Sequence, residues 1–136
     1  MRANRPEELP VVFRHHLNAG DVAGLMAHYY ASDAIYAPVP GVVLSGAELE
    51  ASIARLVSLR APIDVTVRHV LDAGEIALLV VDWSIPAAGM SGTATDIARR
   101  QPDGAWKCAI DNPHGGAVSV ELRPDVAAVL AGQADG

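Results

Sequence analysis

The chain has 136 residues, of which 51% are hydrophobic and 19% are charged. This length allows one domain with a buried core, and the composition argues against global disorder. The net charge of −6, with the basic residues scattered, argues against nucleic acid as a partner, because phosphate binding needs a basic surface. Cys108 is the only cysteine, which excludes an intrachain disulfide and a cysteine-based zinc site.

The N-terminal stretch MRANRPEELP lacks the apolar core of a signal peptide. No uninterrupted apolar run approaches the length of a membrane span. We therefore expect a soluble, cytoplasmic protein with no membrane partner. We also expect a single domain over residues 1–136, with its core at about 8–115 and a tail at 117–136.

The first half of the chain is expected to be mainly helical. Apolar residues recur at helical spacing from about Pro6, with regular helix beginning near Pro10 and stopping at Gly20. Asp21 is placed to cap a second, short helix. A third helix is expected over residues 45–59.

The second half of the chain is typical of β-structure, because it alternates or runs apolar between turn signals. Extended structure is expected to begin near residue 34 and to continue at 63–71, 76–85, 90–100 and 106–110. Each long strand follows the previous one through a short turn. A marginal C-terminal helix is expected at 124–130. Helices followed by an antiparallel meander indicate an α+β fold.

Three passages resemble the NTF2-like superfamily, and within it the SnoaL-like and ketosteroid-isomerase-like proteins. They are Leu17-Asn18-Ala19-Gly20-Asp21, Leu44-Ser45-Gly46, and the hairpin over 92–115 with its Pro-Asp-Gly-Ala-Trp turn and Asp-Asn-Pro end. The resemblance covers about residues 8–115. It implies a cone-shaped α+β barrel with helices in the concave face of a curved sheet, a largely apolar pocket for a small ligand, and a homodimer formed through the outer sheet face.

The isomerase site of that family carries over only in part. The family places an aspartate base just before a proline on the first strand, where this chain has Ala37 before Pro38. It places a tyrosine in the first helix, where this chain has Phe13. Only its protonated aspartate has a counterpart here, at Asp96. Ketosteroid isomerase chemistry is therefore not expected.

Side-chain alternation suggests which polar groups face the pocket. In the isomerase-like register Asp96 points inward, and the neighbouring strand then sends Asp82 inward and Trp83 outward, where Trp83 is a candidate for the dimer surface. His69 lies on the valine-rich face of its strand and is expected to look inward as well. We expect His69, Asp82 and Asp96 to converge, because carboxylates in an apolar cavity push their pKa values apart and histidine can act as a base near neutral pH.

Further candidates surround this cluster. Tyr29 or Tyr36 is expected to lie near it as a ligand-binding group. Asp111 is a second candidate base, because some cyclase relatives place an acid on the last strand, and Asn112 is a candidate ligand contact at the mouth. Asp111 and Asn112 can equally serve only to end the strand.

His69 and Asp82 can also have a purely structural role. His69 can be a hydrogen-bonded core residue, and Asp82 can pair with Arg68 or Arg99 or cap a bulge. A metal site is not expected, because His15 and His16 face different directions and have no third ligand at a suitable spacing.

The first functional hypothesis is a cofactor-free acid/base enzyme that acts on a compact hydrophobic carbonyl compound, by isomerisation, cyclisation, or hydration and dehydration. The alternative is a non-catalytic ligand-binding or dimerisation domain of the same fold. An acid locked to an arginine or placed outside the cavity would remove the first hypothesis.

Overall fold

The computed structural model describes residues 1–117, 124–130 and 132. The helical elements are η1 (Pro6–Glu8), α1 (Leu9–Asn18), α2 (Val22–Gly24), η2 (Leu25–Tyr29), α3 (Gly46–Ser58), η3 (Pro86–Ala88), η4 (Gly115–Ala117) and α4 (Pro124–Leu130). The segment η2 is a π-helical turn that continues α2. The helices expected from the periodicity of the sequence are thus confirmed, including the short one at the C-terminal end.

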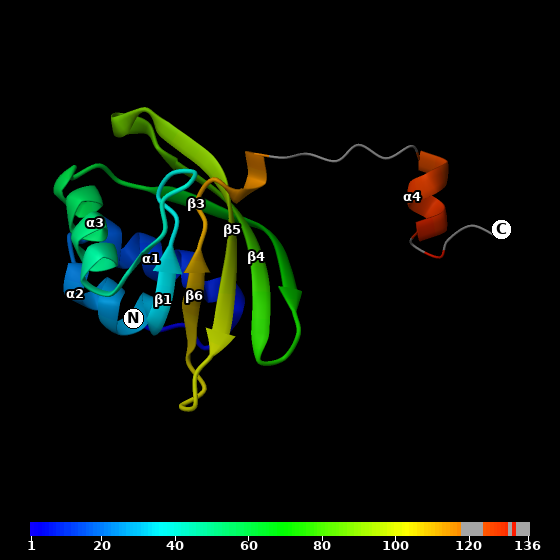
Figure 1. The fold of residues 1–136 in the computed structure, drawn as a ribbon, viewed down its shortest axis with the longest axis horizontal. Coiled ribbons are helices and arrows are strands. Elements are labelled where there is room, and N and C mark those ends of the chain that lie inside the picture. The colour runs from blue at the N-terminus through cyan, green and yellow to red at the C-terminus, as the bar shows by residue number, and fades with distance from the viewer. Residues whose placement is uncertain (118–123, 131, 133–136) are drawn as a thin grey trace.

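The strands form one sheet within the described residues. They are β1 (Tyr30–Tyr36), β2 (Leu44–Ser45), β3 (Asp64–Asp72), β4 (Ile76–Ile85), β5 (Met90–Arg100) and β6 (Trp106–Asp111). Their order in the sheet is β2-β1-β6-β5-β4-β3 (Figure 1). All neighbours are antiparallel except β1 and β6, which run parallel. The α+β fold and the four-stranded meander are confirmed.

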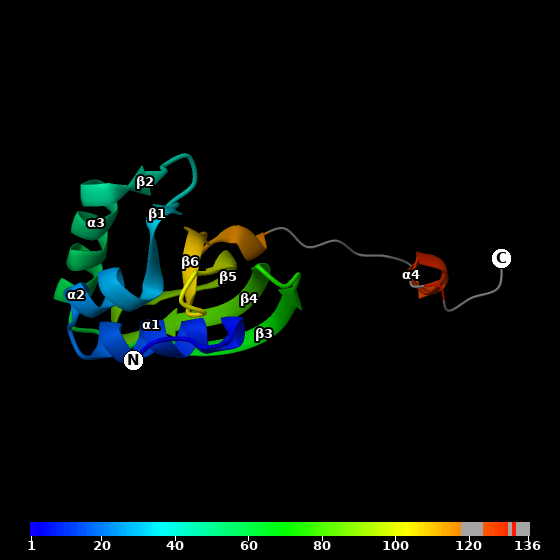
Figure 2. The same cartoon turned by 90° about the horizontal axis from the view of Figure 1, so that it is seen from below.

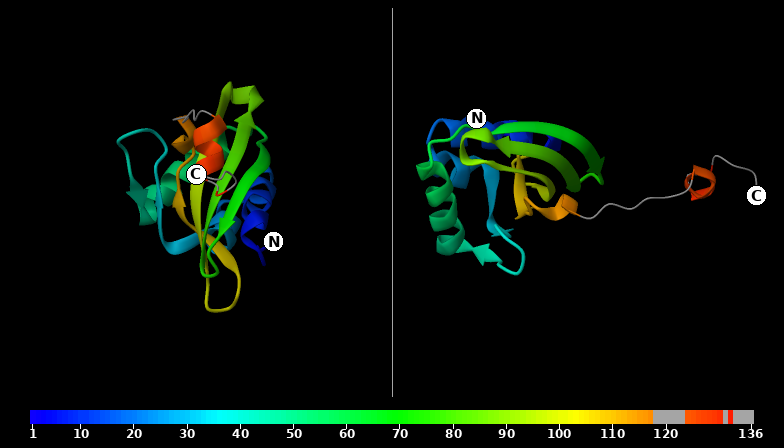
Figure 3. Two further views of the ribbon diagram at one scale, coloured as in Figure 1. Left: turned by 90° about the vertical axis from the view of Figure 1, so that its right-hand side faces the viewer. Right: turned by 90° about the horizontal axis from the view of Figure 1, so that it is seen from above.

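The sheet is curved, and the N-terminal helices cover its concave face. Figure 2 shows α1 lying across β3 to β6 while α3 stands at one end of the sheet, and Figure 3 shows the same curvature from two other sides. Leu9 and Leu25 from the helices and Leu79 from the sheet are at most 1% exposed, so the core lies between these layers. Burial of this apolar surface is the main force that holds helices to sheet.

Two polar contacts set where the first helices end. Gly20 has a φ of 72°, the left-handed conformation that ends a helix at low cost. The Asp21 carboxylate then accepts from the Gly24 amide at 2.8 Å, which confirms its expected role as a cap. The Asn18 side chain ties the end of α1 to the start of β3, donating to the Ile63 carbonyl and accepting from its amide at 2.9 Å.

A bulge in β3 changes which side chains face the core. The pairing with β4 is regular as far as Val67 and then shifts by one residue before His69. Because strand side chains alternate, the extra residue moves Val70 to the core side and His69 to the solvent side. The expectation that His69 looks inward was therefore wrong.

The facing of β4 was also predicted wrongly. Leu79, Val81 and Ile85 are buried on the concave side, so Asp82 points to the outer face and Trp83 to the concave one. Because β4 is apolar on both faces, its sequence does not show which face is inward. An error of one residue in its register then reverses the facing of every side chain. The inward direction of Asp96 is confirmed, since it pairs with the buried Leu79.

Adjacent leucines on β4 give a test of this facing. Leu79 is 1% exposed, whereas Leu78 is half-buried on the outer face. We expect Leu79→Ala to lower the free energy of unfolding by about 2–5 kcal/mol and the matched control Leu78→Ala by less than about half as much. Urea titrations of both variants would measure this, and an equal or larger loss for Leu78→Ala would contradict the assigned facing.

Candidate functional site

A cavity lies between the helices and the concave face of the sheet. It holds about 660 Å³ of empty space, including the part that is open to solvent. Most of its wall is apolar. The apolar lining residues are Pro10, Phe13, Pro38, Leu56, Ile63, Val65, Val81, Trp83, Ile85, Met90, Ala94 and Pro113. The polar ones are Tyr29, Tyr36, Asp96, Asp111 and His114.

Two aspartates on adjacent strands face each other in this cavity. Asp96 on β5 is 6% exposed and Asp111 at the end of β6 is 7% exposed. Their carboxyl groups share a hydrogen bond. Two carboxyl groups can form such a bond only if one of them carries a proton.

A second bulge brings Asp111 to this position. The pairing of β5 with β6 shifts by one residue between Ile97 and Ala98, so that Ala98 pairs with Cys108 whereas Ile97 pairs with Ile110. Continued alternation from the buried Cys108 would send Ile110 inward and Asp111 outward. The extra residue reverses this, because Ile110 is 38% exposed and Asp111 is buried.

Each aspartate is also held by a group outside the pair. The Asn112 amide donates to Asp96 Oδ1 at 2.8 Å, and the Tyr30 hydroxyl donates to Asp111 Oδ2 at 2.6 Å. An oxygen that accepts from an amide is poorly placed to carry a proton, so the proton of Asp96 belongs on Oδ2. Asp111 therefore accepts from the Tyr30 hydroxyl on one side and from the protonated Asp96 on the other, and the Asn112 amide holds the remaining oxygen of Asp96.

Burial separates the acidities of the two aspartates. Burial, followed by the negative charge of Asp111, holds the pKa of Asp96 well above its ordinary value. Burial also raises the pKa of Asp111, but the hydrogen bonds from Tyr30 and Asp96 limit the rise to about 6. Of the two groups, Asp96 therefore holds its proton more strongly and Asp111 ionises first.

Two tyrosines complete the polar part of the wall. Burial, and next the charge of Asp111, raises the pKa of Tyr36 well above its ordinary value, so its hydroxyl keeps its proton. Among the described residues we find no hydrogen-bond partner for that hydroxyl, which leaves a donor free for a ligand. Tyr29 is buried against Cys108, and burial raises the pKa of its hydroxyl too.

The segment that follows β6 closes one side of the cavity mouth. The Trp83 indole donates to the Pro113 carbonyl at 2.8 Å, and the His114 ring stands edge-on to the Trp83 ring at 5.7 Å. The Asn112 side chain donates to the Thr95 hydroxyl at 3.0 Å. Asn112 therefore acts on the site through its backbone, while its side chain holds the segment to β5.

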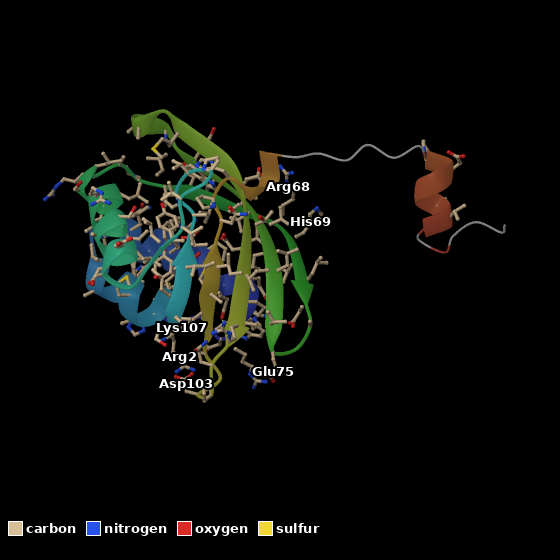
Figure 4. All side chains as sticks on the ribbon, viewed as in Figure 1. Arg2, Arg68, His69, Glu75, Asp103 and Lys107 are labelled. Atoms are coloured by element: carbon tan, nitrogen blue, oxygen red, sulfur yellow. The ribbon has the colours of Figure 1, made fainter. Side chains whose placement is uncertain are left out.

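The expected convergence of His69, Asp82 and Asp96 is not what the structure shows. His69 is exposed on β3, where Figure 4 shows it beside Arg68 at the edge of the sheet. Asp82 lies on the outer face, where it accepts from the Thr93 hydroxyl at 2.7 Å and from Arg68 at 2.9 Å. The Thr93 hydroxyl and the Arg68 guanidinium hold the pKa of Asp82 below its ordinary value.

Four of the residues expected near the site, Asp96, Asp111, Tyr29 and Tyr36, line the cavity. Asp96, Tyr29 and Tyr36 lie where they were expected. Asp111 was kept only as a second candidate base, yet it is the direct partner of Asp96. Trp83 was expected on the outer face of the sheet but lines the cavity. Tyr30 is a buried core residue whose hydroxyl holds Asp111.

Within the described part of the chain no group of three histidine, cysteine, aspartate or glutamate residues could hold a metal ion. None of the described helices is long and apolar enough to cross a membrane.

The arrangement defines an α+β cone with a buried acid pair in its cavity, and comparison with solved structures places this fold. A candidate calcium/calmodulin-dependent protein kinase type II association domain from Thiobacillus denitrificans matches with a TM-score of 0.67 and 20% identity, over 82% of this chain and 95% of that one. A candidate dehydratase of the NTF2-like family from Streptomyces avermitilis matches with a TM-score of 0.58 and 20% identity, over 76% of this chain and 88% of that one.

A candidate ketosteroid isomerase from Parabacteroides distasonis matches with a TM-score of 0.58 and 21% identity, over 78% of this chain and 83% of that one. The chain therefore has the NTF2-like fold, as its sequence passages suggested. No family model and no curated protein sequence matches it.

The acid pair predicts an unusual pH dependence of stability. Because the pKa of Asp111 in the fold lies near 6, above its ordinary 3.8, the folded chain holds more protons than the unfolded one between about pH 4 and 6. Its stabilising contribution is thus complete below about pH 4 and is lost as the pH rises through 6. From pH 5 to 8, we expect wild type to lose on the order of 1 kcal/mol more than Asp111→Asn.

Urea unfolding at both pH values would measure this difference. Asp82→Asn is the control, since the pKa of Asp82 is lowered and its titration lies below this range. If wild type and Asp111→Asn lost equal free energy of unfolding, burial would not raise the pKa of Asp111.

Proposed function

We propose that this protein is a SnoaL-like enzyme that catalyses cofactor-free proton transfer on a compact hydrophobic carbonyl compound. The observation that carries the proposal is the pair of buried carboxyl groups of Asp96 and Asp111 in a mostly apolar cavity, where burial raises the pKa of both. Perturbed acids in a cavity are a common mark of catalytic groups.

Three side chains have distinct roles in this proposal. Asp111, ionised above about pH 6, takes the proton from the carbon next to the carbonyl group. The electron pair of that C–H bond moves into the carbonyl, and the Tyr36 hydroxyl donates to the oxygen that becomes negative. The protonated Asp96 stabilises the pair and can supply a proton to a leaving hydroxyl group.

The outcome depends on where the proton returns. If Asp111 gives it to a different carbon, the substrate is isomerised. If Asp96 protonates a hydroxyl on the neighbouring carbon, water leaves and Asp111 keeps the abstracted proton, which is a dehydration. The names of the similar structures include both a dehydratase and an isomerase, which supports this class of chemistry without selecting a substrate.

The second candidate is a binding protein that uses the same groups only to orient a ligand. The free Tyr36 donor and the apolar wall would serve that role equally well. Proton exchange at the ligand separates the two candidates, because a binder has no reason to accelerate it.

Deuterium exchange on cyclohexanone in heavy water tests the acid/base proposal directly. We expect wild type to accelerate exchange at the carbons next to the carbonyl, with a rate that rises as the pH passes through about 6, where Asp111 ionises. Asp111→Asn should lower the enzymatic rate by a factor of about 10²–10⁴, and Tyr36→Phe by about 10–10³. Proton NMR would follow the loss of signal.

Asp82→Asn and His69→Ala are the matched controls, since both residues lie outside the cavity, and they should leave the rate unchanged. An unchanged rate in Asp111→Asn, or no acceleration by wild type although the ketone binds, would remove the enzymatic proposal and leave the binding protein.

We also propose that the protein forms a homodimer through the outer face of the sheet. An apolar row crosses this face from β1 to β3, because the register aligns one such residue on each of five strands. Its members are Ile35, Ile110, Ile97, Leu78 and Leu71, which are half-buried or exposed. Such a continuous apolar row is typical of an interface.

Sedimentation velocity tests this interface. We expect wild type to sediment as a dimer and Ile97→Glu, at the middle of the row, to shift it to a monomer with an unchanged far-UV circular dichroism spectrum. Val129→Glu, an exposed residue of α4, is the control and should remain dimeric. A wild-type monomer, or a dimer that tolerates Ile97→Glu, would contradict the proposal.

A further inference from the structure

Two uncharged loops border the cavity mouth. One connects β1 to β2 and the other connects β4 to β5. No charged residue occurs from 34 to 47 or from 83 to 95. The cavity wall reaches both loops, through Pro38 in the first and through Met90, the first residue of β5, at the end of the second. The rim is therefore continuous with the wall.

The rim exposes an unusual amount of apolar surface. Val39 is 51% exposed, Val43 is 64% exposed and Met90 is 38% exposed. Both loops lie at the same end of the domain, the upper end in Figure 1. The opposite end carries the charged residues labelled at the bottom of Figure 4, namely Arg2, Glu75, Asp103 and Lys107. Arg68 and His69 on β3 are labelled in the upper half of the same figure, so the absence of charge is a property of the two loops and not of the whole upper end.

The first loop is held in a defined shape beside the acid pair. The Ala37 amide donates to the Asp111 carbonyl at 2.9 Å, so the loop starts from the backbone of the site itself. Val42 then donates to the Val39 carbonyl at 3.2 Å around Pro40 and Gly41, and Gly41 has a φ of 84°. Proline followed by a left-handed glycine is the pattern of a type II turn, which fixes the loop without further contacts.

Polarity changes along the cavity from its closed part to its mouth. Asp96 and Asp111 are at most 7% exposed, whereas Met90 at the rim is 38% exposed. A ligand that places its carbonyl group against the acids must therefore direct the rest of its length toward the apolar rim.

We infer that the rim is an outer binding subsite for the apolar tail of the ligand. The inference rests on the proposed function and refines its ligand class: the compact carbonyl part fills the cavity, and it carries a hydrocarbon tail that extends beyond the cavity. Burying the tail also covers the valines of the first loop, which otherwise face water. Because the rim loops contain no charged residue, they have no charged partner for a polar or ionic tail.

Affinity measured against tail length tests the inference. A series of para-alkylphenols from ethylphenol to hexylphenol is a suitable probe, because the phenol hydroxyl resembles an enol and can meet Asp111 and Tyr36. We expect isothermal titration calorimetry of wild type to show a gain of roughly two- to fourfold in affinity for each added methylene group.

Serine substitutions separate the rim from the cavity. In the triple variant Val39→Ser, Val42→Ser and Val43→Ser, which leaves the cavity lining intact, we expect ethylphenol to bind with near wild-type affinity and the gain per methylene to fall below about 1.5-fold, because the tail no longer meets apolar surface. Leu59→Ser is the matched control, since Leu59 is 53% exposed directly after α3, outside both the cavity lining and the proposed dimer interface, and it should keep the wild-type gain.

The outcomes distinguish the inference from the function on which it rests. Equal affinity for all tail lengths, or a gain that persists in the triple variant, overturns the outer subsite while the cavity proposal stands. Binding of no phenol at any length overturns both. A change in sedimentation of the triple variant, with no dependence on tail length in wild type, would show that a second copy of the chain covers the rim.

Discussion

The hydrogen bond between the buried carboxyl groups of Asp96 and Asp111 is the constraint on which the site depends. Two ionised carboxylates cannot stay in contact in an apolar cavity, because the cost of desolvation and repulsion would exceed what the fold can supply. The pair must keep a proton, and the neighbouring groups decide where. The Asn112 amide and the Tyr30 hydroxyl each occupy one oxygen, so acid and base are already assigned before a ligand arrives.

That assignment is maintained by packing outside the cavity. The segment after β6 supplies the Asn112 amide, and it is fixed by the Trp83 indole and by close approach to β5. A Cβ atom at Gly115 would overlap the Thr95 hydroxyl, so only glycine fits there. The site therefore relies on the segment after β6 to hold a buried acid whose pKa is raised. Keeping such an acid buried lowers the stability of the fold, a trade between stability and function that is common at catalytic sites.

The sequence was sufficient for the elements and for three residues of the site, Asp96, Tyr29 and Tyr36. Periodicity and turn chemistry predicted the helices and the meander, and the family passages predicted the fold and the inward direction of Asp96. The failures have one physical cause, which is register. Bulges in β3 and β6 turn His69 outward and Asp111 inward, and neither bulge leaves a proline or glycine in the sequence to mark it.

The same reasoning explains why Asp82 and Asp111 exchange the roles expected of them. Both are single acids on strands with apolar neighbours, so composition does not separate them. Their environments do, because Asp82 meets a guanidinium and a hydroxyl on the outer face, whereas Asp111 meets a protonated acid and a phenol in the cavity. The extra residue in β6 thus turns Asp111 away from the outer face, where an acid can form a salt bridge, and into the cavity, where it is a candidate base. In this fold, the register of β5 with β6 decides whether Asp111 faces the cavity, which the presence of an aspartate in the sequence does not.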